Sequence, residues 1–463
     1  MRGLKRGRAV TILQDLGKEE KYGRYIAFSR PFLGQNRLIE KDRFNHLHYM
    51  YENCGCQQPP FTARQQMELK MRKALILIVI IAAIILIVQI FRPFQKPKIA
   101  LTMDMNPELA GNLNINWPDN AQGAICIANE GLIDKTPDQS PRPTASVAKM
   151  MTAYLILKDH PLAAYQDGPA LVLTREDERI YERDKRDRQS VVKVVAGEKL
   201  TERQLLEALL LPSANNIATA LARWDSGSVR AFVEKMNKTA HQLGMKDTHY
   251  DDPAGISLST QSSTYDLLLL AQKVMQIDTF KNIVAMPQAT LPLAGTVYNV
   301  NYVLGKEGIV GIKTGSMPRV GGNFVFASYH DVGNRQVLII GALLGVQGRK
   351  PIMDALYGAL DILKTTKGAV QSMHLVKKDE VIGTVSFRPN QVLSLRCAQS
   401  IDSIAWPGRQ FRLTVKLKQM ILPIHKGDTV GTLTLTGENP QTATIVAAQS
   451  IPKPSLLERL TRL

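Results

Sequence analysis

Three short motifs in this chain carry residue types that together can perform nucleophilic chemistry. In chain order they are Ser146-Val147-Ala148-Lys149, Ser213-Ala214-Asn215 and Lys313-Thr314-Gly315. A serine hydroxyl becomes a useful nucleophile only when a neighbouring group takes its proton. The motifs offer a serine, a lysine that can act as base, a second serine that can relay a proton, and a cationic strand that can hold a substrate. They predict a serine acyl-transfer enzyme that works without a catalytic histidine.

The first motif pairs the predicted nucleophile with its base. Ser146 and Lys149 are three residues apart within a predicted helix over 144–157, so their side chains share one face. A lysine accepts a proton only when burial or nearby cations depress its pKa. Apolar neighbours such as Met150 would desolvate Lys149, and Lys313 would add charge repulsion. Taken alone, this four-residue pattern also occurs by chance in many proteins.

The second and third motifs each have an ordinary structural explanation as well. Ser213 fits the capping position of a helix, which would not explain Asn215. In the catalytic interpretation, Ser213 relays a proton to the leaving amine while Asn215 holds Lys149 and the substrate amide. Lys313 and Thr314 would meet a carboxylate, and Gly315 would let a substrate backbone lie along the strand. The alternative for this third motif is a plain turn at an edge strand.

The elements around the motifs predict a sheet covered by helices. A buried strand is expected over 124–129, and Thr201-Glu202-Arg203-Gln204 has the pattern of a capping box that opens a helix through Leu211. Further helices are expected over 213–224 and 229–243, and strands over 309–314, 323–329 and 336–344. Strands at both ends with helices between them predict an antiparallel sheet of the α/β or α+β class.

The last hundred residues have a different character. Short alternating runs at 381–387, 411–417 and 430–435 are separated by Gly, Pro and Asp turns. This spacing predicts a separate small all-β sandwich.

The distribution of charge and hydropathy predicts a membrane anchor. The chain has 463 residues and a formal net charge of +17, and the run from Ala74 to Phe91 contains no charged residue. Such a run is long enough to cross a bilayer. Basic residues precede it and no typical cleavage site follows, so we expect an uncleaved signal-anchor with the N-terminus in the cytoplasm. Basic residues after Phe91 weaken this orientation signal, and a buried core helix is the alternative.

The basic residues are mixed with acids and form no single stripe, so we expect no nucleic-acid partner. Residues 1–73 are expected to be a cytoplasmic segment or an extension upstream of a true start at Met67 or Met71. His46, His48, Cys54 and Cys56 fit zinc spacing poorly, so a flexible tail is favoured there over a metal site. Cys126 and Cys397 fall in different predicted domains and are expected to be buried free thiols.

With these motifs in place, residues from about 120 to 365 resemble the low-molecular-mass penicillin-binding proteins, the serine D-alanyl-D-alanine carboxypeptidases. The likeness is carried by PTASVAKMMTA at 143–153, LLLPSANNIA at 209–218, GIKTGS at 311–316 and GGNFV at 321–325. Connecting pieces also match, among them DPAGI at 252–256 and STYD at 263–266. The segment ILPIHKGDTVG at 421–431 resembles the β-sandwich that the family carries after its catalytic domain.

The resemblance implies a β-lactamase/transpeptidase-like fold and a reaction. Ser146 would attack the bond between the two terminal D-alanines of a peptidoglycan stem peptide, with Lys149 as general base. The N–H groups of Ser146 and Ser316 would form the oxyanion hole. D-Alanine would leave, water would clear the acyl-enzyme, and β-lactams would acylate Ser146 as inhibitors. The resemblance implies neither a metal nor an organic cofactor.

Two departures from the family pattern matter. Arg319 follows the third motif where the family often has a small or acidic residue, and we expect it to help bind the substrate carboxylate. The anchor is N-terminal, whereas many relatives attach through a C-terminal amphipathic helix. The tail at 456–463 is amphipathic but too short to anchor firmly by itself.

Together these features predict the following organisation: a cytoplasmic segment at 1–73, a transmembrane anchor at 74–91, a linker at 92–118, a catalytic domain at 119–366, a β-sandwich at 370–450 and a tail at 451–463. Two other functions stay open. A class A β-lactamase would need a deacylating glutamate, for which Glu234 with Asn237 is the nearest match, although both lie in a predicted amphipathic helix. A catalytically idle cell-wall binding protein or β-lactam sensor is the other.

Overall fold

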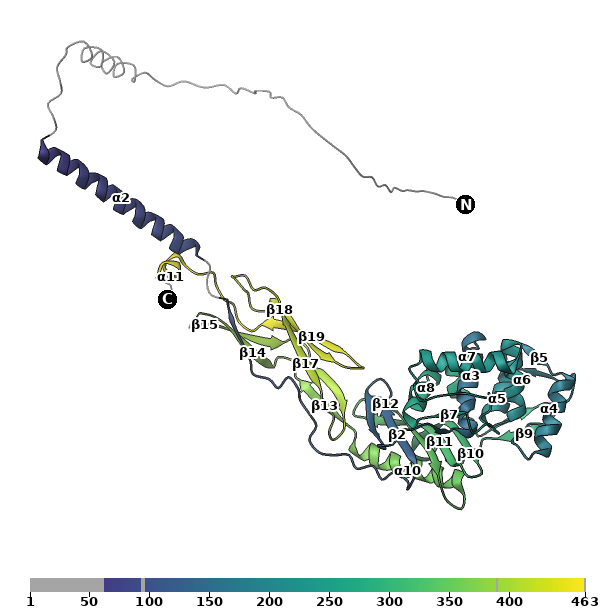
Figure 1. Cartoon of the computed structure of the whole chain (residues 1–463). Coiled ribbons are helices and arrows are strands. Elements are labelled where there is room, and N and C mark those ends of the chain that lie inside the picture. Colours follow the sequence, from purple (N-terminus) through teal and green to yellow (C-terminus); the bar gives the residue numbers. More distant parts are fainter. Residues whose placement is uncertain (1–61, 93–95, 389, 462–463) are drawn as a thin grey trace, which may run out of the picture. The chain divides into compact units, whose positions relative to one another are not determined.

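The computed structural model describes residues 62–92, 96–388 and 390–461 (Figure 1). The chain forms two compact units, of which the first ends at Val88 and the second begins at Gln89. The predicted cytoplasmic segment, with its His46, His48, Cys54 and Cys56, lies almost entirely outside the described residues.

Helix α2 (Ala63–Phe91) dominates the described part of the first unit. It contains the predicted apolar run and also the basic stretch that precedes this run in the chain. None of its residues is buried in the described structure. Among the described helices, α2 alone has the length and apolar composition to cross a membrane, which fits a single-pass anchor.

The second unit contains a larger domain built on a five-stranded antiparallel sheet. The strand order is β10-β11-β12-β2-β3, with β10 at one edge. The strands are β2 (Gln122–Ile127), β3 (Gly131–Lys135), β10 (Ile309–Met317), β11 (Gly321–Val332) and β12 (Arg335–Val346). The two long strands β11 and β12 contain the predicted strands at 323–329 and 336–344 and form a hairpin. The edge position of β10 leaves one side of this strand open for pairing with another extended chain.

Both faces of this sheet are buried, because successive side chains of a strand point to opposite faces. In β2, Ile125 and Ile127 pack in one core with helix α10 (Pro351–Ala369). Ala124 and Cys126 face the opposite core, which is formed with the helices between β3 and β10. The sheet is therefore a middle layer between α10 and a helical cluster.

The helical cluster positions two of the three motifs. Helix α5 begins with the predicted capping box, in which Thr201 Oγ1 accepts from the Gln204 N–H at 3.2 Å and Gln204 Oε1 accepts from the Thr201 N–H at 3.0 Å. The cluster's helices are η1 (Ala145–Ala148), α3 (Lys149–Asp159), α4 (Arg175–Arg186), α5 (Glu202–Leu210), α6 (Asn215–Ser226), α7 (Val229–Gln242), α8 (Thr264–Val274) and α9 (Asp278–Val284). Short elements connect them: β4 (Arg142–Pro143), β5 (Ala170–Val172), β6 (Lys199–Thr201), β7 (Gln261–Ser262), β8 (Gln288–Leu291), β9 (Gly295–Tyr298) and η2 (Lys306–Gly308).

The C-terminal part forms a small all-β domain, here called the β domain. Its six-stranded sheet has the order β1-β14-β15-β19-β18-β17, and β13 pairs with β16 beside it. Its strands are β1 (Lys98–Leu101), β13 (Gln371–Val376), β14 (Val381–Arg388), β15 (Gln391–Cys397), β16 (Ile401–Ala405), β17 (Arg412–Leu417), β18 (Thr429–Thr436) and β19 (Gln441–Ala447). The tail adds helix α11 (Leu456–Thr461). The predicted fold class, a helix-covered antiparallel sheet followed by a small all-β domain, is confirmed.

One predicted segment differs from the structure. Part of the expected linker at 92–118 is strand β1, whose Lys98 and Leu101 pair with Ser386 and Gly383 of β14. Met103, Met105 and Leu109 then pack against the core of the β domain. The Pro and Asn residues of this stretch favour a loop, and a strand of four residues leaves little pattern of its own. The chain that follows α2 therefore joins the β domain before it enters the larger domain.

A buried carboxylate joins the two domains of the second unit. Glu130, in the turn between β2 and β3, accepts from Arg335 Nη2 at 2.8 Å within the larger domain. From the β domain, Asn439 Nδ2 donates to Glu130 Oε1 at 2.8 Å, and Arg409 Nη2 donates to the Glu130 backbone oxygen at 2.7 Å and to Oε2 at 3.2 Å. The predicted free thiols, Cys126 and Cys397, are both buried and unpaired in disulfides.

Candidate active site

The predicted nucleophile and base meet at the start of the central helix. Lys149 Nζ lies 2.8 Å from Ser146 Oγ. The predicted helix over 144–157 is divided into a 3-10 turn, η1, which carries Ser146, and the α-helix α3, which begins at Lys149. Ser146 stays partly accessible while Lys149 is fully buried. A substrate can therefore reach the hydroxyl, whereas water is excluded from the amine.

Two further acceptors hold the Lys149 amine. Nζ donates to Asn215 Oδ1 at 2.6 Å and to the backbone oxygen of Ala254 at 2.8 Å. A neutral amine has two N–H bonds and one lone pair. With both N–H bonds committed to these acceptors, the lone pair is left for the hydroxyl proton of Ser146.

The electrostatic surroundings favour that neutral form. Burial lowers the pKa of Lys149 well below its ordinary value of 10.5, and the nearby cationic Lys313 lowers it further, whereas Asp252 acts in the opposite direction. The prediction that desolvation depresses the pKa of Lys149 therefore agrees with the environment of this residue.

The second motif lies beside this pair in an unusual backbone conformation. Ser213 has a φ of +68°, a left-handed value that is uncommon for a residue other than glycine. Helix α6 begins at Asn215, its capping residue is Ala214, and no side chain caps it. The explanation of Ser213 as an ordinary helix cap is thus excluded. Its hydroxyl is buried and has no hydrogen-bond partner among the described residues.

The third motif lies on the edge strand β10. Lys313 and Thr314 are buried, and Lys313 Nζ donates to the backbone oxygen of Thr314 at 3.0 Å. Burial lowers the pKa of Lys313 to about 7. Gly315 lies against the nucleophile turn, because a Cβ built on it would be 3.0 Å from the backbone nitrogen of Ser146. A side chain at this position would therefore press on the turn that carries the hydroxyl.

The remaining two predicted residues are farther along the same hairpin. Ser316 ends the motif on β10 with an exposed side chain and pairs with Gly322 of β11. Arg319 lies in the exposed turn between β10 and β11 with a φ of +65°. No hydrogen bond or ion pair joins Arg319 to the Ser146–Lys149 pair in the described structure.

Three residues at the site were missed by sequence reasoning as functional positions. Gln189 Oε1 accepts from Asn215 Nδ2 at 2.8 Å, which turns the Asn215 oxygen toward Lys149. Asp252 accepts from the backbone N–H groups of four residues, 254 to 257, at 2.6–3.0 Å and so shapes the loop that presents the Ala254 oxygen. Gly255 has a φ of +77°, and a Cβ there would be 1.8 Å from the Ala145 oxygen.

The sequence gives different indications for these three positions. The DPAGI segment at 252–256 had already matched the family, although no role followed from it. Gln189 follows a highly charged helix and carries no pattern of its own.

Comparison with known proteins decides the family. A sequence profile described as D-alanyl-D-alanine carboxypeptidase matches residues 120–343. A D-alanyl-D-alanine carboxypeptidase of a Streptomyces species is 32% identical over 204 residues, which are 40% of this chain and 68% of that protein. The chain belongs to the D-alanyl-D-alanine carboxypeptidase family.

Other relatives agree. A D-alanyl-D-alanine endopeptidase of Haemophilus influenzae is 30% identical over 215 residues, 45% of this chain and 70% of that protein. In fold, penicillin binding protein 5 from Haemophilus influenzae aligns with a TM-score of 0.52 at 18% identity, over 75% of this chain and 99% of that one. The carboxypeptidase DacD from Francisella tularensis aligns with a TM-score of 0.54 at 18% identity, over 74% and 95%.

Membership makes this chain a serine hydrolase of the penicillin-binding class. The family acts through an acyl-enzyme on peptidoglycan peptides that end in D-Ala-D-Ala, and its members bind β-lactams.

The position of the β-lactamase candidates disfavours that alternative. Glu234 lies on the exposed face of α7 in an ion pair with Arg230. The Asn237 side chain is used structurally, because its Oδ1 accepts from the Tyr250 N–H at 2.8 Å and its Nδ2 donates to the Tyr250 oxygen at 2.7 Å. Neither side chain is available to activate a water at Ser146.

Proposed function

We propose that Ser146 is the nucleophile of a D-alanyl-D-alanine carboxypeptidase reaction and that neutral Lys149 is its base. The single observation that carries this proposal is the 2.8 Å separation of Ser146 Oγ from a fully buried Lys149 Nζ. Lys149 takes the hydroxyl proton as Oγ attacks the carbonyl carbon of the penultimate D-alanine. The new C–O bond replaces the peptide C–N bond, and D-alanine leaves after its nitrogen receives a proton.

The other motif residues receive supporting roles. Asn215 and the Ala254 oxygen orient Lys149, while the unpartnered Ser213 hydroxyl relays the proton toward the leaving amine. The backbone N–H groups of Ser146 and Ser316 stabilise the oxyanion, a contribution of about 3 kcal/mol per donor in other serine enzymes. Water then hydrolyses the acyl-enzyme with the same base.

Substrate binding is assigned to the edge strand β10. The stem peptide adds to this edge as an extra strand, which the glycine at 315 allows to approach closely. Lys313 and Thr314 bind its terminal carboxylate, and Arg319 assists from the hairpin turn. β-Lactams occupy the same place and acylate Ser146.

We further propose that α2 anchors the protein with its N-terminus in the cytoplasm. Support comes from Lys70, Arg72 and Lys73, which directly precede the apolar run. The larger domain and the β domain are then exported. A fluorescent penicillin that does not cross membranes should label the protein on intact spheroplasts, and labelling only after permeabilisation would reverse this orientation.

The test of the reaction compares the full chain with Ser146→Ala and with Ser372→Ala, which removes an exposed serine of the β domain. We expect the parent and Ser372→Ala to bind fluorescent penicillin covalently and to release D-alanine from a stem-peptide mimic. Ser146→Ala should do neither. Activity retained by Ser146→Ala would overturn the nucleophile assignment, and rapid turnover of the penicillin adduct would favour a β-lactamase instead.

A further inference from the structure

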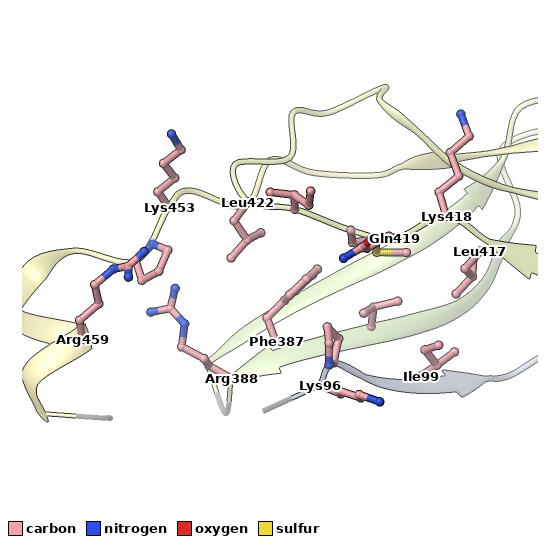
Figure 2. A pocket seen from close by; sticks show the side chains of 15 residues that line it. Lys96, Ile99, Phe387, Arg388, Leu417, Lys418, Gln419, Leu422, Lys453 and Arg459 are labelled. Carbon is pink, nitrogen blue, oxygen red and sulfur yellow. The ribbon is translucent and has the colours of Figure 1, made fainter. Parts of the chain in front are cut away.

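The β domain contains a cavity that the carboxypeptidase reaction does not use. It has a volume of about 680 Å³ and is lined by strands β1 and β14, the end of β17, the loop after β17 and the tail (Figure 2). No residue of the larger domain lines it. Such a volume is within the range of small-ligand sites.

The lining is strongly basic. Five of its fifteen residues are lysine or arginine and none is acidic: Lys96, Arg388, Lys418, Lys453 and Arg459. One neighbouring carboxylate, Glu458, pairs with Arg388 at 2.8 Å and offsets part of this charge. The three lysines are exposed, and Figure 2 shows their side chains extending outward while Phe387 and Leu422 lie between them. Cations thus surround an apolar floor.

Exposed apolar side chains lie beside these cations. Ile421, in the loop after β17, is 74% exposed, and Leu456 at the start of α11 is 66% exposed. A phospholipid headgroup has the matching chemistry, because its phosphate is anionic and its glycerol and acyl boundary is apolar. A soluble anion such as free phosphate would leave the apolar side chains without a partner.

The chain itself brings this cavity to a membrane surface. Helix α2 ends at Phe91, and Lys96 of the cavity lies five residues further on. Five residues span at most about 18 Å. Strand β1 then follows at Lys98 and fixes this side of the cavity. The cavity is therefore tethered close to the headgroup layer at the end of α2.

From these observations we infer that the cavity is a binding site for anionic phospholipid headgroups, which docks the β domain on the membrane that α2 spans. The inference rests on the proposed anchoring role of α2 but not on the assignment of Ser146 and Lys149. The inference holds for either orientation of α2, because the cavity follows α2 in the chain and lies on the side of the membrane where Phe91 emerges.

The test uses the full chain in nanodiscs of phosphatidylcholine, with or without phosphatidylglycerol, and measures hydrogen exchange of the backbone amides at 419–422. A lysine near an anionic surface strengthens association by about fivefold. We expect exchange to slow by at least about fivefold when phosphatidylglycerol is present, and the effect to fall with added salt.

Two triple variants of equal charge change separate the site from bulk electrostatics. Lys96→Gln, Lys418→Gln and Lys453→Gln together should abolish the protection by phosphatidylglycerol. Lys158→Gln, Lys238→Gln and Lys246→Gln together remove three exposed lysines of the larger domain and should keep it. Equal exchange in both lipids, or protection that persists in the first variant, would overturn the inference.

Two controls make the outcome unambiguous. Inorganic phosphate added to phosphatidylcholine nanodiscs should give no protection, and full protection by phosphate would show that the cavity takes a soluble anion and not a membrane. Fluorescent penicillin should label both triple variants as it labels the parent. If the parent itself fails to label, the proposed reaction fails while the headgroup inference stands on its exchange data.

Discussion

At the scale of single residues, the proposed reaction depends on two buried lysines whose positive charge is disfavoured by the fold. Lys149 and Lys313 come from different elements, α3 and β10, and burial lowers both pKa values. Apolar residue types around the motif were enough to predict the depressed pKa of Lys149. Burial of Lys313 depends on the packing of an edge strand against η1, which the motif itself does not encode.

The pKa of Lys313 predicts a pH-dependent stability. Its pKa is about 7 in the folded chain and 10.5 ordinarily, so between these values the unfolded chain binds more protons and folding stability rises with pH. Below about pH 7 the free-energy cost of burying the charged Lys313 side chain is constant and amounts to a few kcal/mol. Lys313→Met should therefore raise the unfolding temperature at pH 7 and reduce this dependence, as measured by calorimetry at pH 7 and 9. A parent protein that loses stability from pH 7 to 9 relative to Lys313→Met would contradict the assignment.

Gln189 gives a prediction for a positioning residue. Without its oxygen, the Asn215 amide loses the contact that turns Oδ1 toward Lys149. Gln189→Leu should slow acylation by penicillin about tenfold, corresponding to one hydrogen bond of about 1.4 kcal/mol. The acid limb of the pH profile should also move to lower pH, because the Asn215 oxygen accepts from Lys149 and so favours its ammonium form, and this oxygen is then held less firmly. A slower rate with an unmoved pH profile would indicate only a structural role for Gln189.

At the scale of elements, the site is built where three backbones approach closely. The turn η1 is enclosed by β10 at Gly315 and by the 252–257 loop at Gly255. The sequence predicted the helix and strand that carry the motifs. It did not predict that η1 is a 3-10 turn or that Ser213 adopts a left-handed conformation, because both depend on contacts between segments distant in the chain.

The close approach at Gly255 can be tested with a matched glycine. A Cβ at Gly255 would lie 1.8 Å from the Ala145 oxygen, whereas Gly244 has a similar φ, +79° against +77°, with nothing within 4 Å. Gly244→Ala should lower the free energy of unfolding only by the conformational strain of a left-handed alanine, about 1 kcal/mol. Gly255→Ala should cost several kcal/mol more and slow penicillin acylation at least about tenfold, because it displaces the nucleophile turn. Similar unfolding and acylation data for both variants would contradict the proposed role of Gly255.

At the scale of the whole molecule, the order of domains along the chain was only partly predictable. The sequence indicated a catalytic region followed by a β-sandwich. The assignment of residues 98–101 to the β domain required knowledge of their pairing with β14, which lies almost three hundred residues later. Short strands with long-range partners leave little pattern of their own in a sequence.

The Glu130 cluster predicts how the two domains are held together. Glu130→Ala removes the acceptor of Arg335, Arg409 and Asn439 and leaves a partly buried guanidinium without its anion. Removing one partner of a buried ion pair in this way lowers the free energy of unfolding by about 3 kcal/mol. We expect faster proteolysis between the domains with unchanged penicillin acylation. The exposed pair Arg230–Glu234 supplies the control, because Glu234→Ala should cost less than about 0.5 kcal/mol. Equal protease resistance of parent and Glu130→Ala would argue against this role.

The most direct test of the central claim is the pH dependence of the acylation rate constant at saturating penicillin, measured on the full chain. Because the pKa of Lys149 lies well below 10.5, the rate constant should reach its plateau before pH 10 and should fall only toward acid pH. A rate constant that rises tenfold per pH unit up to pH 10 would mean that Lys149 is an ordinary ammonium in the resting enzyme, and it would contradict the account.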